Sequence, residues 1–209
     1  MEKILIEKRD FFKINMDSDN QLDIKNIFGN DNPVHLEIGS GRGEFLIQKA
    51  LNFPDVNFLG VDIKEKRIKT MLRKLDLEKH ANVKLLRVLV DENIKKWIKA
   101  NSLEKIYILH PDPWPKRKHH KHRLIQESFI DALSKVLVLN GILEIATDHE
   151  EYTNWIIKLF KDRCNFISHF KDGFVRTPQE SHIETYFETK KRNEGFEPFF
   201  MKYEKIGEK

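Results

Sequence analysis

The sequence predicts an α/β fold built on a mostly parallel β-sheet. Short apolar segments alternate with longer amphipathic segments from residue 34 to residue 161. The first apolar segment stops at a glycine-rich turn, as a strand does before a crossover helix. Hydrophobic residues make up 40% of the 209 residues, which is enough for the full core of one domain.

The elements follow one another in a regular order. The first strand is expected at 34–38, with later strands at 57–62, 83–88, 105–110 and 142–147. Helices are expected between and after them, at 44–51, 64–79, 92–99, 123–139 and 151–161. Strands that alternate with helices imply right-handed crossovers and therefore a mostly parallel sheet.

The two ends of the chain depart from this alternation. Residues 166–170 and 196–203 are strand-like with no obvious helix between them, which favours an antiparallel pair at the sheet edge. A dinucleotide-binding fold would more often continue with a sixth parallel strand. We therefore expect seven strands, helices on both faces and an antiparallel C-terminal hairpin. Residues 1–31 are polar, with a loop at 17–20, and are expected to be an N-terminal extension to a single domain at 32–209.

The composition restricts the cellular compartment and the partners expected for the protein. The net charge of +4 is too modest to indicate nucleic-acid binding by itself. The one cysteine, Cys164, cannot form a disulfide within the chain, and nothing near it would activate its thiol. There is neither a signal-peptide pattern nor an apolar run that could span a bilayer. We expect a cytoplasmic protein with no membrane partner.

A glycine-rich turn joins the first strand to the first helix. Gly39, Gly41 and Gly43 give the spacing G-x-G-x-G, without the lysine of a phosphate-binding P-loop. Glu37, two residues earlier, would repel a pyrophosphate and suits a ligand that carries ammonium and sulfonium groups. Asp62 ends the second strand, where a carboxylate can accept hydrogen bonds from ribose hydroxyls. The structural alternatives are a simple turn at the glycines and a solvated strand-end aspartate.

A proline-rich loop follows the fourth strand. Three prolines stiffen His110–Pro115, at the strand end where open α/β sheets bind ligands. The loop presents Asp112 beside Trp114, so a carboxylate and an indole together can hold a planar base. The alternative is a rigid turn with a purely structural role.

A basic run continues from this loop. Lys116–Arg123 contains five Lys or Arg and three His in eight residues, which predicts contacts with phosphates. The alternative is a solvated or disordered loop. The three histidines lack the spacing of a tetrahedral zinc site and no cysteine lies near them, so no metal is expected.

Asp148 ends the fifth strand. Because the fourth and fifth strands are expected to be neighbours, Asp112 and Asp148 should face one cleft. Asp148 is also suitable as the N-cap of the following helix, and the two roles are compatible.

Together these segments resemble the bacterial tRNA (guanine-N7) methyltransferase family, which has the class I, Rossmann-like methyltransferase fold. The resemblance covers about residues 28 to 203. The glycine motif is shared by many methyltransferases, whereas Pro111–Lys116 with the basic run and Thr185–Glu188 are much more specific. The matching segments are Leu36–Gly43, Phe58–Asp62, Pro111–Lys116, Ala146–Asp148 and Thr185–Glu188.

The resemblance implies S-adenosylmethionine as cofactor and tRNA as partner, with methylation of the variable-loop guanine at position 46. It implies that Asp112 is catalytic, at the junction of cofactor and base. The cofactor would be bound by Glu37, Gly39, Gly41, Gly43, Asp62, Asp112 and the position of Leu89. The substrate would be bound by Lys116, Asp148, Thr185, Tyr186, Phe187 and Glu188, and the tRNA backbone by Arg117, Lys118, Lys121 and Arg123.

One position departs from the family pattern. Family members usually have an acidic residue near the adenine where this chain has Leu89, and Asp91 is the nearest carboxylate along the chain. Two rival functions stay open. One is a methyltransferase for another RNA, a protein or a small molecule, and for the last two the basic run would not be needed. A non-catalytic RNA-binding protein would not need the glycines or Asp112. The sequence is compatible with a monomer or a homodimer.

Overall fold

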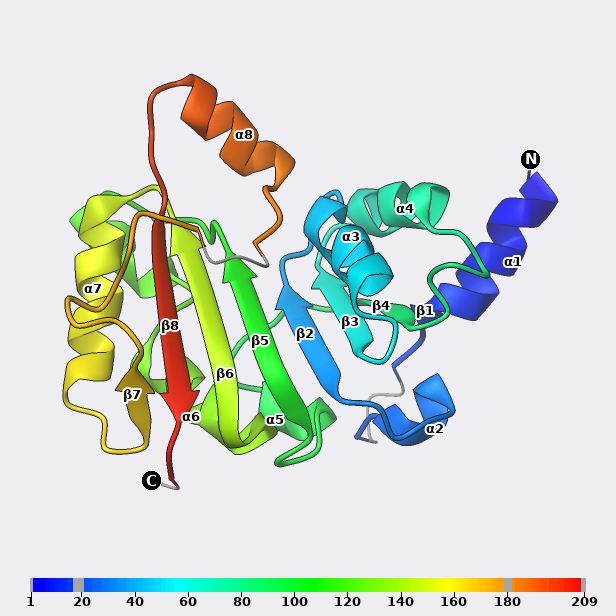
Figure 1. Ribbon diagram of the computed structural model, residues 1–209, viewed down its shortest axis with the longest axis horizontal. Helices are drawn as coiled ribbons and strands as arrows, with labels where there is room; N and C mark the ends of the chain where they lie inside the picture. The colour runs from blue at the N-terminus through cyan, green and yellow to red at the C-terminus, as the bar shows by residue number, and fades with distance from the viewer. Residues whose placement is uncertain (1, 17–20, 179–181, 208–209) are drawn as a thin grey trace.

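The computed structural model describes residues 2–16, 21–178 and 182–207. Residues 17–20, expected to form a loop, lie outside that part of the chain. The sheet has eight strands in the order β1-β4-β3-β2-β5-β6-β8-β7 (Figure 1). The strands are β1 (Lys13–Ile14), β2 (Val34–Ile38), β3 (Asn57–Asp62), β4 (Val83–Arg87), β5 (Leu103–Leu109), β6 (Leu137–Thr147), β7 (Phe166–Ser168) and β8 (Phe199–Lys205).

Helices connect the strands. They are α1 (Glu2–Phe12), α2 (Ile24–Phe28), α3 (Glu44–Asn52), α4 (Glu65–Lys74), α5 (Ile94–Trp97), the 3₁₀ helix η1 (Arg117–His122), α6 (Glu127–Val136), α7 (Glu150–Lys161) and α8 (Tyr186–Asn193). No helix in the described ranges combines the length and the apolar character needed to cross a membrane.

The strand pairing confirms the predicted sheet. The strands from β1 through β4, β3, β2 and β5 to β6 pair in parallel, and β8 pairs antiparallel with both β6 and β7. In the centre, Leu36 of β2 lies opposite Leu59 of β3 on one side and Ile106 of β5 on the other. The carboxyl ends of the parallel strands therefore meet at one edge, the upper edge in Figure 1.

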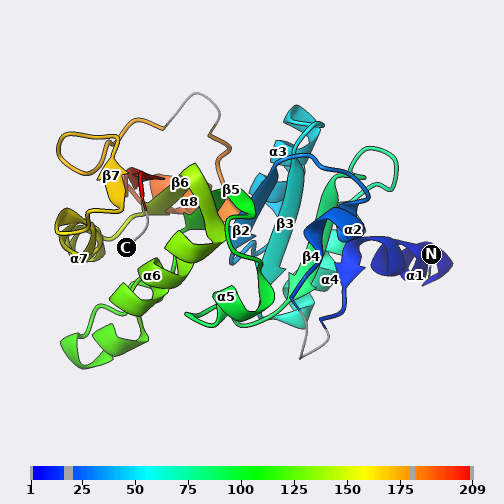
Figure 2. The same cartoon turned by 90° about the horizontal axis from the view of Figure 1, so that it is seen from below.

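The helices lie on both faces of the sheet. On one face, α3 and α4 pack on β3 and β4 through a cluster that includes Leu46 and Met71. On the other face, α5, α6 and α7 pack on a larger cluster that includes Ile130 and Ile156. Figure 2 shows α3 on one side of the sheet and α5 and α6 on the other.

The prediction of seven strands was wrong by one. The additional strand is β1, whose Lys13 and Ile14 pair with Leu85 and Leu86 of β4. Two residues are too few for an alternating pattern, so the sequence carries no sign of this strand. The preceding Phe12 is completely buried in the cluster beneath α3 and α4, which ties the N-terminal segment to the sheet.

The expectation that no helix separates the last two strands was also wrong. Helix α8 lies between β7 and β8 and stands above the carboxyl edge of the sheet (Figure 1). Only Glu188 is buried among its residues, so the sequence of this segment has no apolar periodicity that would predict a helix. Three expected helices are shorter in the structure: α4 ends at Lys74, α5 spans Ile94–Trp97, and α6 spans 127–136 because residues from Leu137 onward join β6.

Gly60 lets α3 approach the sheet closely. A Cβ atom at this position would lie 2.4 Å from Cδ2 of Leu46 and 3.0 Å from Oγ of Ser40. Leu46 is 1% exposed, so its side chain has little room to move away. The absence of a side chain at Gly60 therefore sets the distance between α3, the glycine turn and β3.

We predict that Gly60→Ala lowers the free energy of unfolding by about 1–3 kcal/mol, because it overpacks this contact. Urea denaturation followed by circular dichroism measures the change. Gly207→Ala is the matched control, since an added Cβ there meets nothing within 4 Å. Equal stability of the two variants would contradict the close approach.

Candidate active site at the carboxyl edge

A cleft of about 940 Å³ opens at the carboxyl edge of the parallel strands. Its walls come from the glycine turn after β2, the ends of β3, β4 and β5, the start of α6 and the start of α8. The predicted site residues that line it are Glu37, Gly39, Gly41, Asp62, Leu89, Asp112, Lys121, Arg123, Thr185, Tyr186 and Phe187. The tertiary structure thus brings together residues from both halves of the chain.

The three glycines of the turn adopt left-handed backbone conformations. Their φ angles are 77° at Gly39, 57° at Gly41 and 77° at Gly43, which favour glycine over residues with a side chain. The N–H groups of Gly39 and Ser40 donate to the Val61 carbonyl of β3 at 2.9 and 3.0 Å. A Cβ at Gly39 would meet nothing within 4 Å, so the turn leaves free space for a ligand beside its backbone.

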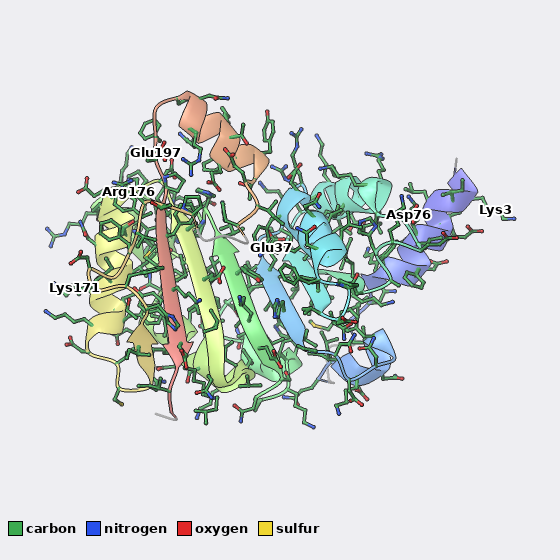
Figure 3. All side chains as sticks on the ribbon, in the orientation of Figure 1. Lys3, Glu37, Asp76, Lys171, Arg176 and Glu197 are labelled. Carbon is green, nitrogen blue, oxygen red and sulfur yellow. The ribbon has the colours of Figure 1, made fainter. Side chains whose placement is uncertain are left out.

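Glu37 carries a buried carboxyl group with an unmatched oxygen. The residue is 3% exposed, and its Oε2 has no hydrogen-bond partner among the described residues. Burial, followed by the nearby charges of Glu44 and Asp62, raises the pKa of Glu37 to about 8. A cationic ligand group in the cleft would supply the missing partner (Figure 3 labels Glu37 at the end of β2).

Asp62 fastens the glycine turn to the loop after β3. One carboxylate oxygen accepts from the Gly41 N–H at 3.1 Å, and the other accepts from the Lys64 N–H at 2.7 Å. Each oxygen has a further lone pair, so Asp62 can also accept from a ligand hydroxyl.

One end of the cleft is lined by apolar and acidic residues that follow β3 and β4. Ile63 and Leu89, which follow β3 and β4, are 50% and 62% exposed. Asp91 also lines this end, and its Oδ1 accepts from the Asn93 N–H at 2.8 Å. Leu89 and Asp91 therefore both reach the cleft, although β4 ends earlier than expected, at Arg87.

The proline-rich loop presents Asp112 to the cleft. Residues on either side of the first two prolines have positive φ angles, 52° at His110 and 43° at Trp114, a conformation that is unfavourable for residues with bulky side chains. Asp112 is exposed and lines the cleft. No hydrogen bond or ion pair engages its carboxylate within the described ranges, so it is available to a ligand.

Arg123 supports this loop from a buried position, although it was expected to contact the tRNA backbone. Its side chain is 0% exposed; Nε donates to the Pro113 carbonyl at 2.9 Å, and Nη2 pairs with Glu151 of α7 at 3.0 Å. The guanidinium also lies 5.1 Å from the rings of Tyr152 and Trp155. A buried arginine with these partners supports the loop and is shielded from phosphates.

The lysines and Arg117 of the basic run are at the surface. Lys116, Arg117, Lys118 and Lys121 are all exposed, and most of the run forms η1. The rings of His119 and His122 lie 5.7 and 5.3 Å from the Trp114 ring. Among the described residues, no group of three His, Cys, Asp or Glu side chains is arranged to hold a metal ion.

Helix α8 brings the Thr185–Glu188 segment to the mouth of the cleft. Thr185 is the N-cap, and its Oγ1 accepts from the Glu188 N–H at 3.1 Å. Tyr186 and Phe187 are 56% and 41% exposed, and both line the cleft. Across the mouth, the Arg42 guanidinium of the glycine turn lies 4.3 Å from the centre of the Tyr186 ring.

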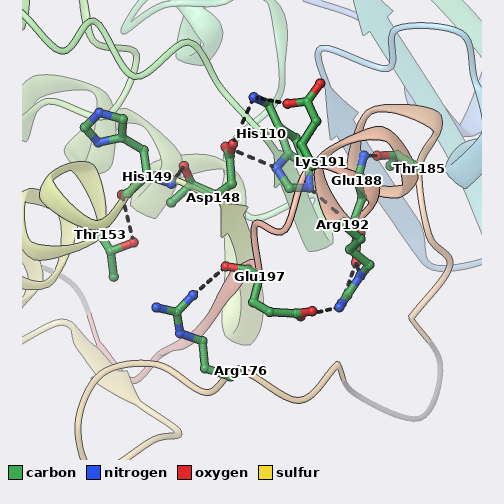
Figure 4. A network of polar contacts seen from close by, with 12 residues as sticks. His110, Asp148, His149, Thr153, Arg176, Thr185, Glu188, Lys191, Arg192 and Glu197 are labelled. Atoms are coloured by element: carbon green, nitrogen blue, oxygen red, sulfur yellow. Dashed lines mark hydrogen bonds and ion pairs between the residues drawn. The ribbon is translucent and has the colours of Figure 1, made fainter.

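Glu188 points away from the cleft into a network of polar contacts (Figure 4). Its Oε2 lies 2.7 Å from His182 Nε2, and its Oε1 accepts from Arg192 at 3.0 Å. Burial would raise its pKa, but His110, His182 and Arg192 outweigh burial and lower the pKa to about 2. Glu188 is therefore ionised and anchors α8.

Asp148 belongs to the same network. Its carboxylate lies 3.9 Å from Nδ1 of His110 and 3.8 Å from Nζ of Lys191 on α8. It sits at the carboxyl edge beside the cleft, while Asp112 lies in the cleft itself. The N-cap of α7 is His149, whose Nδ1 accepts from the Tyr152 N–H at 3.3 Å, so the N-cap alternative for Asp148 was wrong.

Sequence reasoning assigned no role to His110, which the structure places at the centre of this network. Its side chain is 4% exposed, with Nε2 at 3.8 Å from Glu188. Nothing in a His-Pro dipeptide shows that its partners come from β6 and α8, so the sequence held no signal for it.

Comparison with known proteins gives similar sequences over most of the chain. The family described as "Putative methyltransferase" matches residues 31–201. A tRNA (guanine-N(7)-)-methyltransferase of Buchnera aphidicola is 37% identical over 88% of this chain and 77% of its own length. The protein of that name from Vibrio parahaemolyticus is 34% identical over 88% and 78% of the two chains.

Solved structures share the fold at low sequence identity. An antibiotic-related methyltransferase matches with a TM-score of 0.59 and 15% identity, over 93% of this chain and 96% of its own. A 30S ribosomal A1408 methyltransferase from an uncultured bacterium matches with a TM-score of 0.56 and 16% identity, over 93% and 98%.

We predict that Arg123→Lys destabilises the protein by about 1–3 kcal/mol, because lysine keeps the charge but loses the forked hydrogen bonds. Guanidinium chloride denaturation measures the difference. Arg117→Lys, at an exposed position of η1, should leave stability unchanged. Wild-type stability of Arg123→Lys would show that Arg123 does not support the proline loop.

Proposed function

Because the chain belongs to the tRNA (guanine-N(7)-)-methyltransferase family, we propose that it transfers a methyl group from S-adenosylmethionine to N7 of a guanine in tRNA. The observation that carries the proposal is the position of Asp112. Its unpaired carboxylate faces the same cleft as the Glu37 carboxyl and the glycine turn, beside an exposed basic helix. One cleft thus combines a site for a cationic cofactor with a surface for an anionic polymer.

The residues of the cleft fit S-adenosylmethionine. Glu37 has a buried, unpartnered oxygen that suits an ammonium group, and Gly39 leaves space beside its backbone. Asp62 suits ribose hydroxyls, and the apolar pair Ile63 and Leu89 suits an adenine ring. When bound, S-adenosylmethionine supplies an electrophilic methyl group on a sulfonium.

Asp112 is the proposed catalytic residue. Guanine N7 has a lone pair and no proton, so it can attack the methyl carbon directly as the carbon–sulfur bond breaks. The protein then needs no general base; it must position the base and stabilise the positive charge that develops on the ring. An exposed carboxylate on a stiff loop is suited to both tasks.

The mouth of the cleft is suited to a nucleotide of an RNA chain. Trp114, Tyr186 and Phe187 expose aromatic surface on which a base can stack. Lys116, Arg117, Lys118 and Lys121 would neutralise phosphates on one side. Thr185 and Asp148 are proposed to contact the substrate, and Glu188 to act by holding the segment that carries Phe187.

At a finer level, we propose that the substrate is the guanine at position 46 in the variable loop, and that the reaction takes place in the cytoplasm with the pool of tRNA. The sequence resemblance supports the position within tRNA. The single cysteine supports a reducing compartment.

The test is incubation of the protein with unmodified tRNA and methyl-labelled S-adenosylmethionine, followed by nuclease digestion. We expect 7-methylguanosine at position 46. Asp112→Asn should lower turnover by about 10²–10³-fold while tRNA still binds. Asp55→Asn, at an exposed position near the opposite edge, is the matched control. Label in another nucleoside or in protein would refute the proposal, and wild-type turnover of Asp112→Asn would refute the role of Asp112.

Cofactor affinity should depend on pH through Glu37. In the free protein the pKa of Glu37 is about 8, so at pH 6 its carboxyl group holds a proton that a bound cation would expel. Affinity should therefore rise by up to about tenfold per pH unit from pH 6 to pH 8, and then level off.

Isothermal titration calorimetry in two buffers of different ionisation enthalpy measures the proton released. Glu37→Gln should bind the cofactor more weakly and without this proton release. Because the variant lacks the titratable carboxyl group, any pH dependence that remains comes from titration of the ligand itself. A wild-type affinity that does not change with pH would show that Glu37 is not protonated or does not face the cation.

A further inference from the structure

His110 lies where three separate segments meet. It follows the last residue of β5 and begins the proline loop that carries Asp112, and its two ring nitrogens face carboxylates from other elements. Nδ1 is 3.9 Å from Asp148 at the end of β6, and Nε2 is 3.8 Å from Glu188 on α8 (Figure 4). Neither nitrogen has a hydrogen-bond partner among the described residues. The two contacts are ion pairs when the ring is protonated.

The charges around this ring favour a cation. Asp148 is otherwise approached by Lys191, at 3.8 Å, and Glu188 by His182 and Arg192. All three of these other partners come from α8 or the segment just before it. His110 is thus the group that joins the carboxylates of the network to the loop of Asp112.

We propose that His110 is a positioning residue for the methyl transfer, and that its imidazolium bridges Asp148 and Glu188 so that α8 is held against the loop that carries Asp112. The proposal rests on the proposed function. It assigns His110 no contact with the substrate.

The state of His110 affects the wall of the cleft that α8 provides. Phe187 precedes Glu188, and its ring centre lies 5.0 Å from that of His110. Thr185 caps the same turn of α8. When His110 is charged, the Thr185–Phe187 wall is fixed relative to Asp112. When it is neutral, the half-buried Asp148 and the buried Glu188 lose the cation between them, and the wall is free to shift.

The titration of the ring has a definite sign. Burial lowers the pKa of His110, but Asp148 and Glu188 outweigh burial and raise it above the ordinary value of histidine. Its stabilising contribution is complete below the pKa of an unfolded histidine and is lost as pH rises through the raised folded pKa. The bridge should therefore weaken as pH rises through a pKa that lies above the ordinary value of histidine.

The first test needs no substrate. NMR titration of ¹³C-labelled histidines should give His110 a pKa above that of an exposed histidine, and Asp148→Asn and Glu188→Gln should each lower it. His169, which pairs with Glu204 of β8 at 2.8 Å, serves as the reference that these two variants leave unchanged. A His110 pKa at or below the ordinary value, or one indifferent to both variants, would overturn the proposal.

The second test uses activity. His110→Gln and His110→Phe should lower kcat/KM for tRNA by about tenfold to a hundredfold through misplacement of the wall, with cofactor affinity within about twofold of wild type. The alkaline decline of the wild-type rate should disappear in both variants. His169→Gln is the control, and thermal denaturation checks that each variant is folded.

Unchanged kcat/KM and an unchanged alkaline limb in both folded variants would overturn the positioning role. The two tests also separate this inference from the proposed function. If the wild-type protein methylates no tRNA, the proposed function fails and the positioning role fails with it. The NMR titration would then still decide whether His110 bridges β6 and α8.

Discussion

Parallel pairing of the central strands places their carboxyl ends, and the acidic residues there, at one edge of the sheet. Glu37, Asp62 and Asp148 arrive at that edge from β2, β3 and β6, and α8 adds Glu188 from above. A carboxylate withdrawn from water is costly unless hydrogen bonds or opposite charges replace the solvent. Most of the polar architecture of the site follows from the need to compensate these four groups.

The compensation differs from one carboxylate to the next. Asp62 is satisfied by backbone N–H groups and Glu188 by His182 and Arg192. These groups hold the glycine turn and α8 in place. Glu37 retains an unpartnered oxygen, and Asp112 faces the cleft unpaired. The two carboxyl groups without a full set of partners are those best placed to meet a cationic cofactor and a base that becomes positively charged.

Rigidity at Asp112 comes from its surroundings more than from its prolines. The left-handed conformations of His110 and Trp114 are unfavourable and must be maintained by other contacts. Arg123 donates a hydrogen bond to the Pro113 carbonyl, and His110 lies between two carboxylates. Removal of these supports would let the loop relax, which explains why basic and imidazole side chains are buried next to an exposed aspartate.

The sequence by itself determined the parallel sheet, the glycine turn with Glu37, and the proline loop with Asp112, because each depends on residues that are adjacent in the chain. Apolar alternation, glycines and prolines act locally, so they predict strands and turns directly. Only the tertiary structure decided the roles of Arg123, His110 and Glu188, and the presence of β1 and α8. A basic residue within a basic run is indistinguishable from its neighbours until Glu151 and two aromatic rings close over it. The partners of His110 lie 38 and 78 residues further along the chain, and such distant contacts leave no periodic pattern in the sequence.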